Sequence, residues 1–215
     1  MTRIIRRGVN GLRTSALRLA TCRSANSLTE FALMLPLLIT AGMYGLEMTW
    51  MHNAGMQVSQ VAISVADNAA RMEQTSNSGT APTVTESDIN AVLSGGVMES
   101  NGLNIAARGR IIISSLEQNG GGNQYIHWQR CTGGLTNASR YGAQGTVVAA
   151  MGSGSTTITA PATSSVMFAE VYYRYQPLFG TMFVQPMMFH QEAAFLTRDD
   201  RNLTSGTSGT GAANC

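Results

Sequence analysis

The longest apolar stretch of the chain lies near its N-terminus. Residues 31–46 read FALMLPLLITAGMYGL and contain no charged side chain. With its flanks the stretch extends from Leu28 to Met51. At about 1.5 Å per residue, a helix of this length crosses a hydrocarbon core of roughly 30 Å. The pattern therefore predicts a membrane-spanning helix.

Apolar residues continue beyond this stretch at spacings of three and four, which is typical of an amphipathic helix. They are Leu46, Trp50, Ala54, Val58, Val61, Val65, Ala69 and Met72. A signal peptide cut near Ala41–Gly42 is the alternative, but a break usually follows such a peptide. The unbroken stripe favours a retained helix over residues 26–74, transmembrane to about Met51 and amphipathic after it.

The next part of the chain, residues 75–107, is predicted to be a linker that contains one short helix. The segment 74–83 (QTSNSGTAPT) is polar and breaks helices. Thr85 is a suitable N-cap, Glu86 and Asp88 place acids in the first turn, and Gly95-Gly96 are expected to end the helix after about Ser94.

Residues 108–200 have the composition and alternation of β-strands. A turn at Asn119–Gly122 separates two strand-like runs and predicts a hairpin. The last run could also be helical, because it contains alanines and Glu192. We expect an antiparallel sheet of four or five strands, packed on the outer half of the long helix in an α+β fold. The predicted strands are Arg110–Leu116, Gln124–Arg130, Thr146–Ala150, Ser165–Tyr175 and His190–Thr197.

Charge is distributed very unevenly along the chain. All 14 basic residues are arginines, and only 12% of the chain is charged, about half the usual share. The arginines before the apolar stretch predict that residues 1–25 form a basic cytoplasmic leader and that the later residues lie outside. The remainder is net acidic, which argues against nucleic-acid binding. The leader arginines are Arg3, Arg6, Arg7, Arg13, Arg18 and Arg23.

A carboxylate, that of Glu30, lies at the N-terminal edge of the predicted span. A charge at this depth is costly and should have a partner. If the chain were cut between Ala25 and Asn26, Glu30 would be the fifth residue, and the new α-amino group of this or an adjacent subunit could pair with it. Alternatively, Glu30 simply marks the cytoplasmic headgroup boundary.

The segment Ser27-Leu28-Thr29-Glu30-Phe31-Ala32-Leu33-Met34-Leu35-Pro36-Leu37-Leu38 resembles the signature of the TadE-like family. In that family a small residue precedes Glu-Phe-Ala, apolar residues and a proline, which here are Glu30, Phe31 and Pro36. Type IV leaders usually end in Gly, whereas Ala25 occupies that position here. The strong match covers about 25 residues.

The resemblance implies a pilin-like fold and a non-catalytic role as a minor pilin or pseudopilin of the Tad/Flp type IV pilus system. It implies cleavage by a prepilin peptidase between Ala25 and Asn26. Glu30, Phe31 and Pro36 would then serve assembly and subunit register. The expected partners are other pilins and assembly subunits. The expected location is the inner membrane, with a periplasmic C-terminal domain that can enter the extracellular pilus.

Two cysteines, Cys131 and Cys215, lie in the part predicted to be exported. In such a domain they are most simply a disulfide, although two free thiols are the alternative. The tail 201–215 is small and polar, and we expect it to be flexible unless Cys215 holds it.

The sequence carries no recognisable motif for catalysis or metal binding. The chain has no Lys and no G-x-S-x-G motif, and His52, His127 and His190 are isolated. Only His190 and Glu192 stand at a ligand spacing, which alone is a weak sign of a metal site. Nearby methionines, Met182, Met187 and Met188, could suggest a soft-metal site, but loop packing is the better explanation because the chain has 13 methionines throughout its length.

We therefore predict no enzyme, no cofactor and no metal. The alternative functions are a single-pass membrane protein with a periplasmic binding domain unrelated to pili, and an exported enzyme or metal carrier with an unrecognised site.

Overall fold

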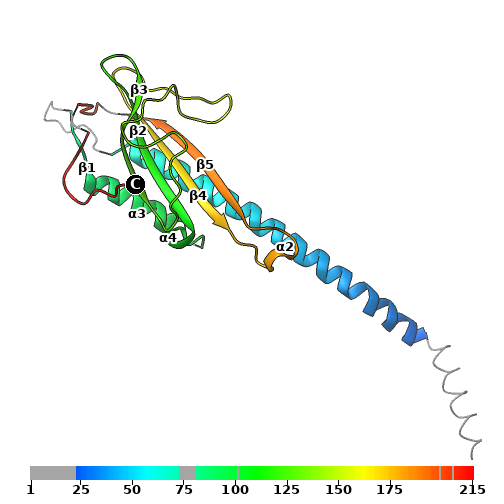
Figure 1. Ribbon diagram of the computed structural model, residues 1–215. Coiled ribbons are helices and arrows are strands. Elements are labelled where there is room, and N and C mark those ends of the chain that lie inside the picture. The colour runs from blue at the N-terminus through cyan, green and yellow to red at the C-terminus, as the bar shows by residue number, and fades with distance from the viewer. Residues whose placement is uncertain (1–22, 73–80, 101, 199, 205) are drawn as a thin grey trace, which may run out of the picture. The chain divides into compact units, whose positions relative to one another are not determined.

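The computed structural model describes residues 23–72, 81–100, 102–198, 200–204 and 206–215, with residues 23–25 described by their backbone alone (Figure 1). The chain divides into two compact units, Met1–Thr49 and Trp50–Cys215. The predicted basic leader lies outside the described residues, apart from the backbone of residues 23–25.

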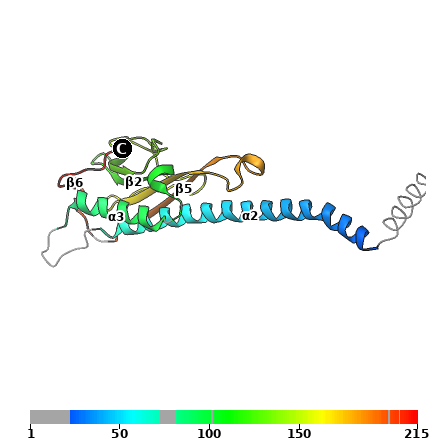
Figure 2. The ribbon, with the colours of Figure 1, turned by 90° about the horizontal axis from the view of Figure 1, so that it is seen from below.

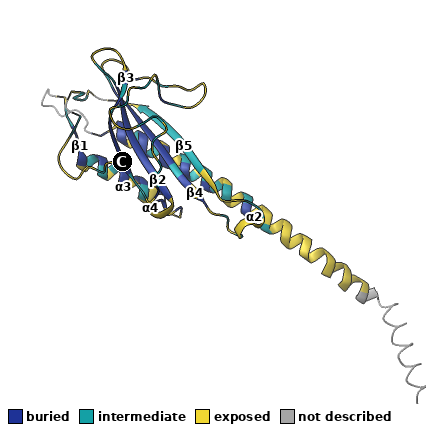
Figure 3. Ribbon diagram, viewed as in Figure 1, coloured by how far each residue is buried: buried dark blue, intermediate teal, exposed yellow. Residues whose placement is uncertain are grey.

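The first element is one unbroken helix, α2 (Arg23–Ala70), of 48 residues. It includes Pro36, where the Thr40 hydroxyl donates to the Pro36 carbonyl at 2.7 Å. Its segment Asn26–Ala70 is long and apolar enough to cross a membrane. Residues 26–42 are all exposed (Figure 3), so none of the residues that the structure describes covers them.

The second unit is built on an antiparallel sheet of four strands in the order β3-β2-β4-β5 (Figure 1). The predicted hairpin is confirmed, and the last strand-like run is a strand and not a helix. The strands are β2 (Gly109–Gln118), β3 (Gln124–Thr132), β4 (Val166–Tyr175) and β5 (Met187–Leu196).

The two faces of the sheet pack against different parts of the chain. One face carries Ile111 and Ala169 and packs on the second half of α2 (Figure 2). The predicted stripe is buried there from Ala54 to Met72, although Trp50 and Leu46 remain exposed. The other face is covered by the connection 133–165. The core between this face and the connection consists of Leu116, Ile126, Met151, Ala160, Val166 and Phe168. Because β4 lies inside the sheet and is covered on both faces, its side chains are largely buried.

Helix α3 (Glu86–Glu99) is longer than the predicted linker helix, which was expected to end near Ser94. Gly95 and Gly96 lie inside it. A Cβ on Gly96 would stand 2.5 Å from Val65 Cγ2 and 3.1 Å from Ile111 Cδ1, so the glycine lets α3 approach α2 and the sheet closely. Thr85 is the N-cap, as predicted, and accepts a hydrogen bond from the Asp88 amide at 3.2 Å.

The secondary structure of several short segments differs from the one predicted from the sequence. Thr146–Ala150 is not a strand, and only Val147 forms an isolated bridge, with Tyr125. Short elements that the pattern did not indicate are α4 (Ile105–Arg108), the 3-10 helix η1 (Gly180–Met182), β1 (Val84–Thr85) and β6 (Thr207–Ser208).

The C-terminal tail, expected to be flexible unless Cys215 holds it, makes several hydrogen bonds to the domain. Strand β6 pairs with β1 in parallel, and the Thr207 hydroxyl donates to Glu86 Oε1 at 2.5 Å. The same carboxylate accepts from Arg130, with Nε 2.9 Å from Glu86 Oε2. Both charged side chains are almost fully buried, at 3% exposed for Glu86 and 7% for Arg130. Hydrogen bonds to this buried pair fix the tail, although its composition is polar.

Candidate functional site

The residues predicted to serve assembly all lie in α2. Asn26, Glu30, Phe31 and Pro36 are exposed, and Phe31 is 59% exposed. Ala25 belongs to the same helix by its backbone. No described residue covers these side chains, so lipid or another helix can meet them. Cleavage at Ala25 and the roles of the other residues stay predictions.

The two predicted disulfide partners lie next to each other. The Cys131 and Cys215 side chains form a hydrogen bond, and Arg110 Nη2 donates to Cys131 Sγ at 2.8 Å. The pKa of Cys131 falls to about 7, mainly because Cys215 stabilises its thiolate, and Arg110 adds to this effect against burial. The neighbouring Cys131 raises the pKa of Cys215. Both are free thiols here, so the disulfide stays a prediction.

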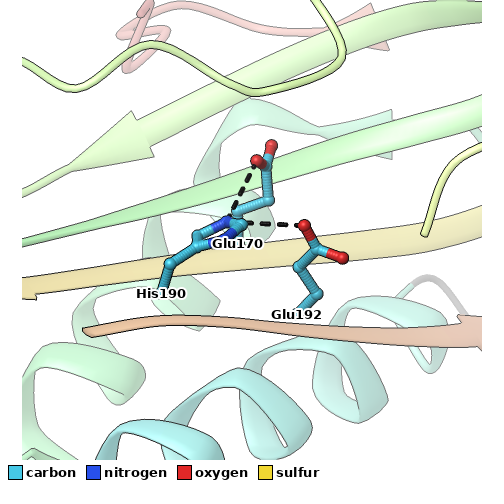
Figure 4. Close-up of side chains that lie close together, drawn as sticks. All are labelled: Glu170, His190 and Glu192. Atoms are coloured by element: carbon cyan, nitrogen blue, oxygen red, sulfur yellow. Dashed lines mark ion pairs between the residues drawn. The ribbon is translucent and has the colours of Figure 1, made fainter. Parts of the chain in front are cut away.

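A third group, which we call the Glu-His-Glu cluster, consists of Glu170, His190 and Glu192. Glu170 on β4 is paired directly with Glu192 on β5. His190, two residues before Glu192, points to the same face because side chains alternate along a strand. Figure 4 shows the imidazole between the two carboxylates. His190 Nε2 lies 3.4 Å from Glu170 Oε1 and 3.5 Å from Glu192 Oε1.

Glu170 is the most enclosed member of the cluster, with no exposed surface. Its Oε1 accepts from the Arg140 backbone amide at 3.0 Å and from the Tyr172 hydroxyl at 3.2 Å. Burial raises the pKa of Glu170, but hydrogen bonds from His190, Ser139 and the Arg140 amide outweigh it, so the pKa is lowered. A buried Glu170 is therefore held as a carboxylate.

Glu192 is fixed from the covering connection 133–165. The Tyr141 hydroxyl lies 3.0 Å from each of its oxygens, and Ser153 Oγ donates to Oε2 at 2.7 Å. Burial and the bond to Glu192 raise the pKa of Tyr141, which therefore stays protonated as a donor. The carboxylate thus has a defined orientation although β5 is an edge strand.

A hollow of about 620 Å³ adjoins the cluster. His190 and Glu192 line it, together with Arg140, Ser153 and Phe168. The hollow gives water or a small ligand access to two members of the cluster. Arg140 Nη1 lies 3.8 Å from Glu192 Oε1, and because the Arg140 side chain is 60% exposed, it can turn away from the cluster.

Sequence reasoning identified His190 with Glu192 but not Glu170. The signal for Glu170 is a carboxylate in the middle of a mostly apolar strand, where a buried charge requires a partner. The pairing of β4 with β5 then decides which side chain it meets.

Comparison of the chain with protein-family models, with curated proteins and with solved structures found no match.

Proposed function

We propose that this protein is a minor pilin or pseudopilin of a Tad-type type IV pilus, a structural subunit without catalytic activity. The observation that carries the proposal is the exposed apolar surface of α2. Leu28, Leu33 and Leu37 are 70%, 74% and 67% exposed. A surface of this kind is stable only when lipid or other apolar side chains cover it.

The proposed mechanism is the transfer of this helix between two environments. Before assembly, α2 is held by the hydrocarbon core of the inner membrane, with residues 1–25 cytoplasmic and the second unit periplasmic. A prepilin peptidase removes the leader between Ala25 and Asn26. In the pilus, like helices replace the lipid and cover the same apolar residues.

Glu30 has the most specific task in this mechanism. A carboxylate among exposed apolar residues is costly to desolvate unless a positive group lies beside it. The α-amino group of Asn26 in an adjacent subunit would supply that charge after cleavage. The pair then sets the axial position of one subunit against the next. Phe31 and Pro36 shape the helix surface that follows.

The test compares Glu30→Ala with Thr29→Ala, a neighbouring exposed polar residue whose hydroxyl donates to the Asn26 carbonyl. Both variants should insert into the membrane, because neither shortens the apolar segment. Only Glu30→Ala should be depleted from sheared pili, as measured by quantitative immunoblot of membrane and pilus fractions. Wild-type levels of Glu30→Ala in pili would refute the role of Glu30.

Intact mass of the membrane-extracted protein tests the processing step, with a mature chain that begins at Asn26 as the expected result. An uncut chain would favour a second candidate, a single-pass membrane protein with a periplasmic binding domain. The hollow beside the Glu-His-Glu cluster is the observation that favours this alternative.

A further inference from the structure

We propose that the Glu-His-Glu cluster is a binding site for a divalent cation of the zinc class. The site would use Glu170, His190 and Glu192 as ligands. This inference is independent of the pilin proposal, because it concerns only side chains of the sheet and its covering connection.

The donor set is the first argument. Zinc is bound in proteins by imidazole nitrogen and carboxylate oxygen, commonly through three protein ligands with one open position. The Glu170 and Glu192 carboxylates together with a neutral His190 carry two negative charges, which match a divalent ion. Calcium is less suited to the site, because it prefers six to eight oxygen ligands.

The spacing of the donor atoms is the second argument. Ligand atoms at about 2.0–2.1 Å from a tetrahedral ion stand roughly 3.3–3.4 Å apart. His190 Nε2 lies 3.4 Å from Glu170 Oε1 and 3.5 Å from Glu192 Oε1. One donor atom from each of the three residues can be chosen so that all lie within 4.8 Å of one another. Small side-chain shifts would therefore bring the three donor atoms within bonding distance of one ion.

Unsatisfied buried atoms are the third argument. His190 Nε2 and Glu170 Oε2 are both shielded from solvent and lack a well-formed hydrogen bond, because the contacts of Nε2 with the two carboxylates are long, at 3.4 and 3.5 Å. A buried polar atom without a partner destabilises a fold by about 1–3 kcal/mol, so two such atoms in one cluster require an explanation. A bound cation would satisfy Nε2 directly and attract the fully buried Glu170 carboxylate.

The surroundings hold the ligands in place, as the outer partners of metal ligands do. The His190 ring is stacked on Tyr172, with centroids 4.3 Å apart and planes 22° apart. Tyr141 and Ser153 orient Glu192, and the Arg140 amide orients Glu170. The fourth coordination position would open toward the hollow, where water can enter. The ion would thus fasten edge strand β5 to β4.

The competing explanation is a protonated His190 that is ion-paired with both glutamates and binds no metal. The chain offers a matched control for it. His127 forms a partly buried pair with Glu117 at 2.7 Å, an ordinary hydrogen-bond distance. His127→Gln therefore removes a comparable histidine–glutamate pair without touching the proposed site.

The experiment uses the full chain in detergent, stripped with EDTA and then titrated with Zn²⁺ and, for spectroscopy, with Co²⁺. The wild type and His127→Gln should bind one equivalent of Zn²⁺, show a rise in unfolding temperature, and give the visible absorption of tetrahedral Co²⁺. His190→Gln and Glu192→Gln should lose the Co²⁺ bands and bind Zn²⁺ at least about tenfold more weakly.

Two results would overturn the proposal. One is a wild type that binds no stoichiometric Zn²⁺, which would leave the protonated histidine as the explanation. The other is unchanged binding in His190→Gln. Far-UV circular dichroism verifies the fold of each variant, and Glu192→Gln provides a second test if a change at the fully buried Glu170 or at His190 prevents folding.

Discussion

The two adjacent glycines of α3 give a sharp test of the packing. A Cβ on Gly96 would meet Val65 Cγ2 at 2.5 Å and Ile111 Cδ1 at 3.1 Å, whereas one on Gly95 meets nothing within 4 Å. Carbon atoms in contact normally stand about 3.5–4.0 Å apart. The same substitution at neighbouring positions should therefore have opposite effects.

The magnitudes follow from two contributions. Alanine is about 0.8–1.0 kcal/mol more favourable than glycine inside a helix, so Gly95→Ala should raise the free energy of unfolding by up to about 1 kcal/mol. Overpacking costs typically about 1–3 kcal/mol. Gly96→Ala should therefore lower the free energy of unfolding by up to about 2 kcal/mol, since the helix gain offsets part of the clash.

The assay is urea unfolding of the full chain in detergent, followed by tryptophan fluorescence, in which Trp128 on β3, 3% exposed, should change more than Trp50, which is already 44% exposed. Gly96→Val serves as a stronger version of the clash and should be less stable than Gly96→Ala. Equal shifts of Gly95→Ala and Gly96→Ala would refute the reasoning. They would indicate that both glycines lie outside the helix, as the sequence pattern suggested.

Other predictions concern the buried ion pair and the thiols. Arg130→Met leaves Glu86 buried without its cation and should lower the free energy of unfolding in urea by about 3–5 kcal/mol. The control Arg174→Met changes an exposed arginine and should alter the free energy of unfolding by less than about 0.5 kcal/mol. Similar values for the two variants would contradict this prediction. The Arg130 hydrogen bond lowers the pKa of Glu86, so the stabilisation by this pair is fully present above the ordinary carboxyl pKa of 4.5. It is lost as the pH falls through the lowered pKa. The difference in free energy of unfolding between Arg130→Met and wild type should therefore shrink in acid. Mild oxidation should join Cys131 to Cys215, and the reaction should become faster as the pH rises through the Cys131 pKa of about 7. The intact mass should then fall by two hydrogens. The same loss of mass in Cys215→Ser would contradict the pairing.

The local sequence pattern was sufficient to predict the elements in which apolar residues recur at a regular spacing. The stripe from Ala54 to Met72 predicted the packed half of α2, because a period near 3.6 places one face of a helix on a core. The alternation and the aromatic and β-branched residues of 165–175 predicted the strand β4, although the structure buries both of its faces. The long charge-free stretch likewise indicated a helix able to cross a membrane.

Tertiary structure alone decided the features that depend on distant partners. Gly95-Gly96 signal a helix end in isolation, but α3 continues through them, and Gly96 lies where α3 packs closely on Val65 and Ile111. Glu170 is an isolated acid in the sequence, and only the pairing of β4 with β5 brings it to His190 and Glu192. Periodicity records which side of an element is buried. It does not record which other element covers that side, because strand order and register are set by contacts between residues far apart in the chain.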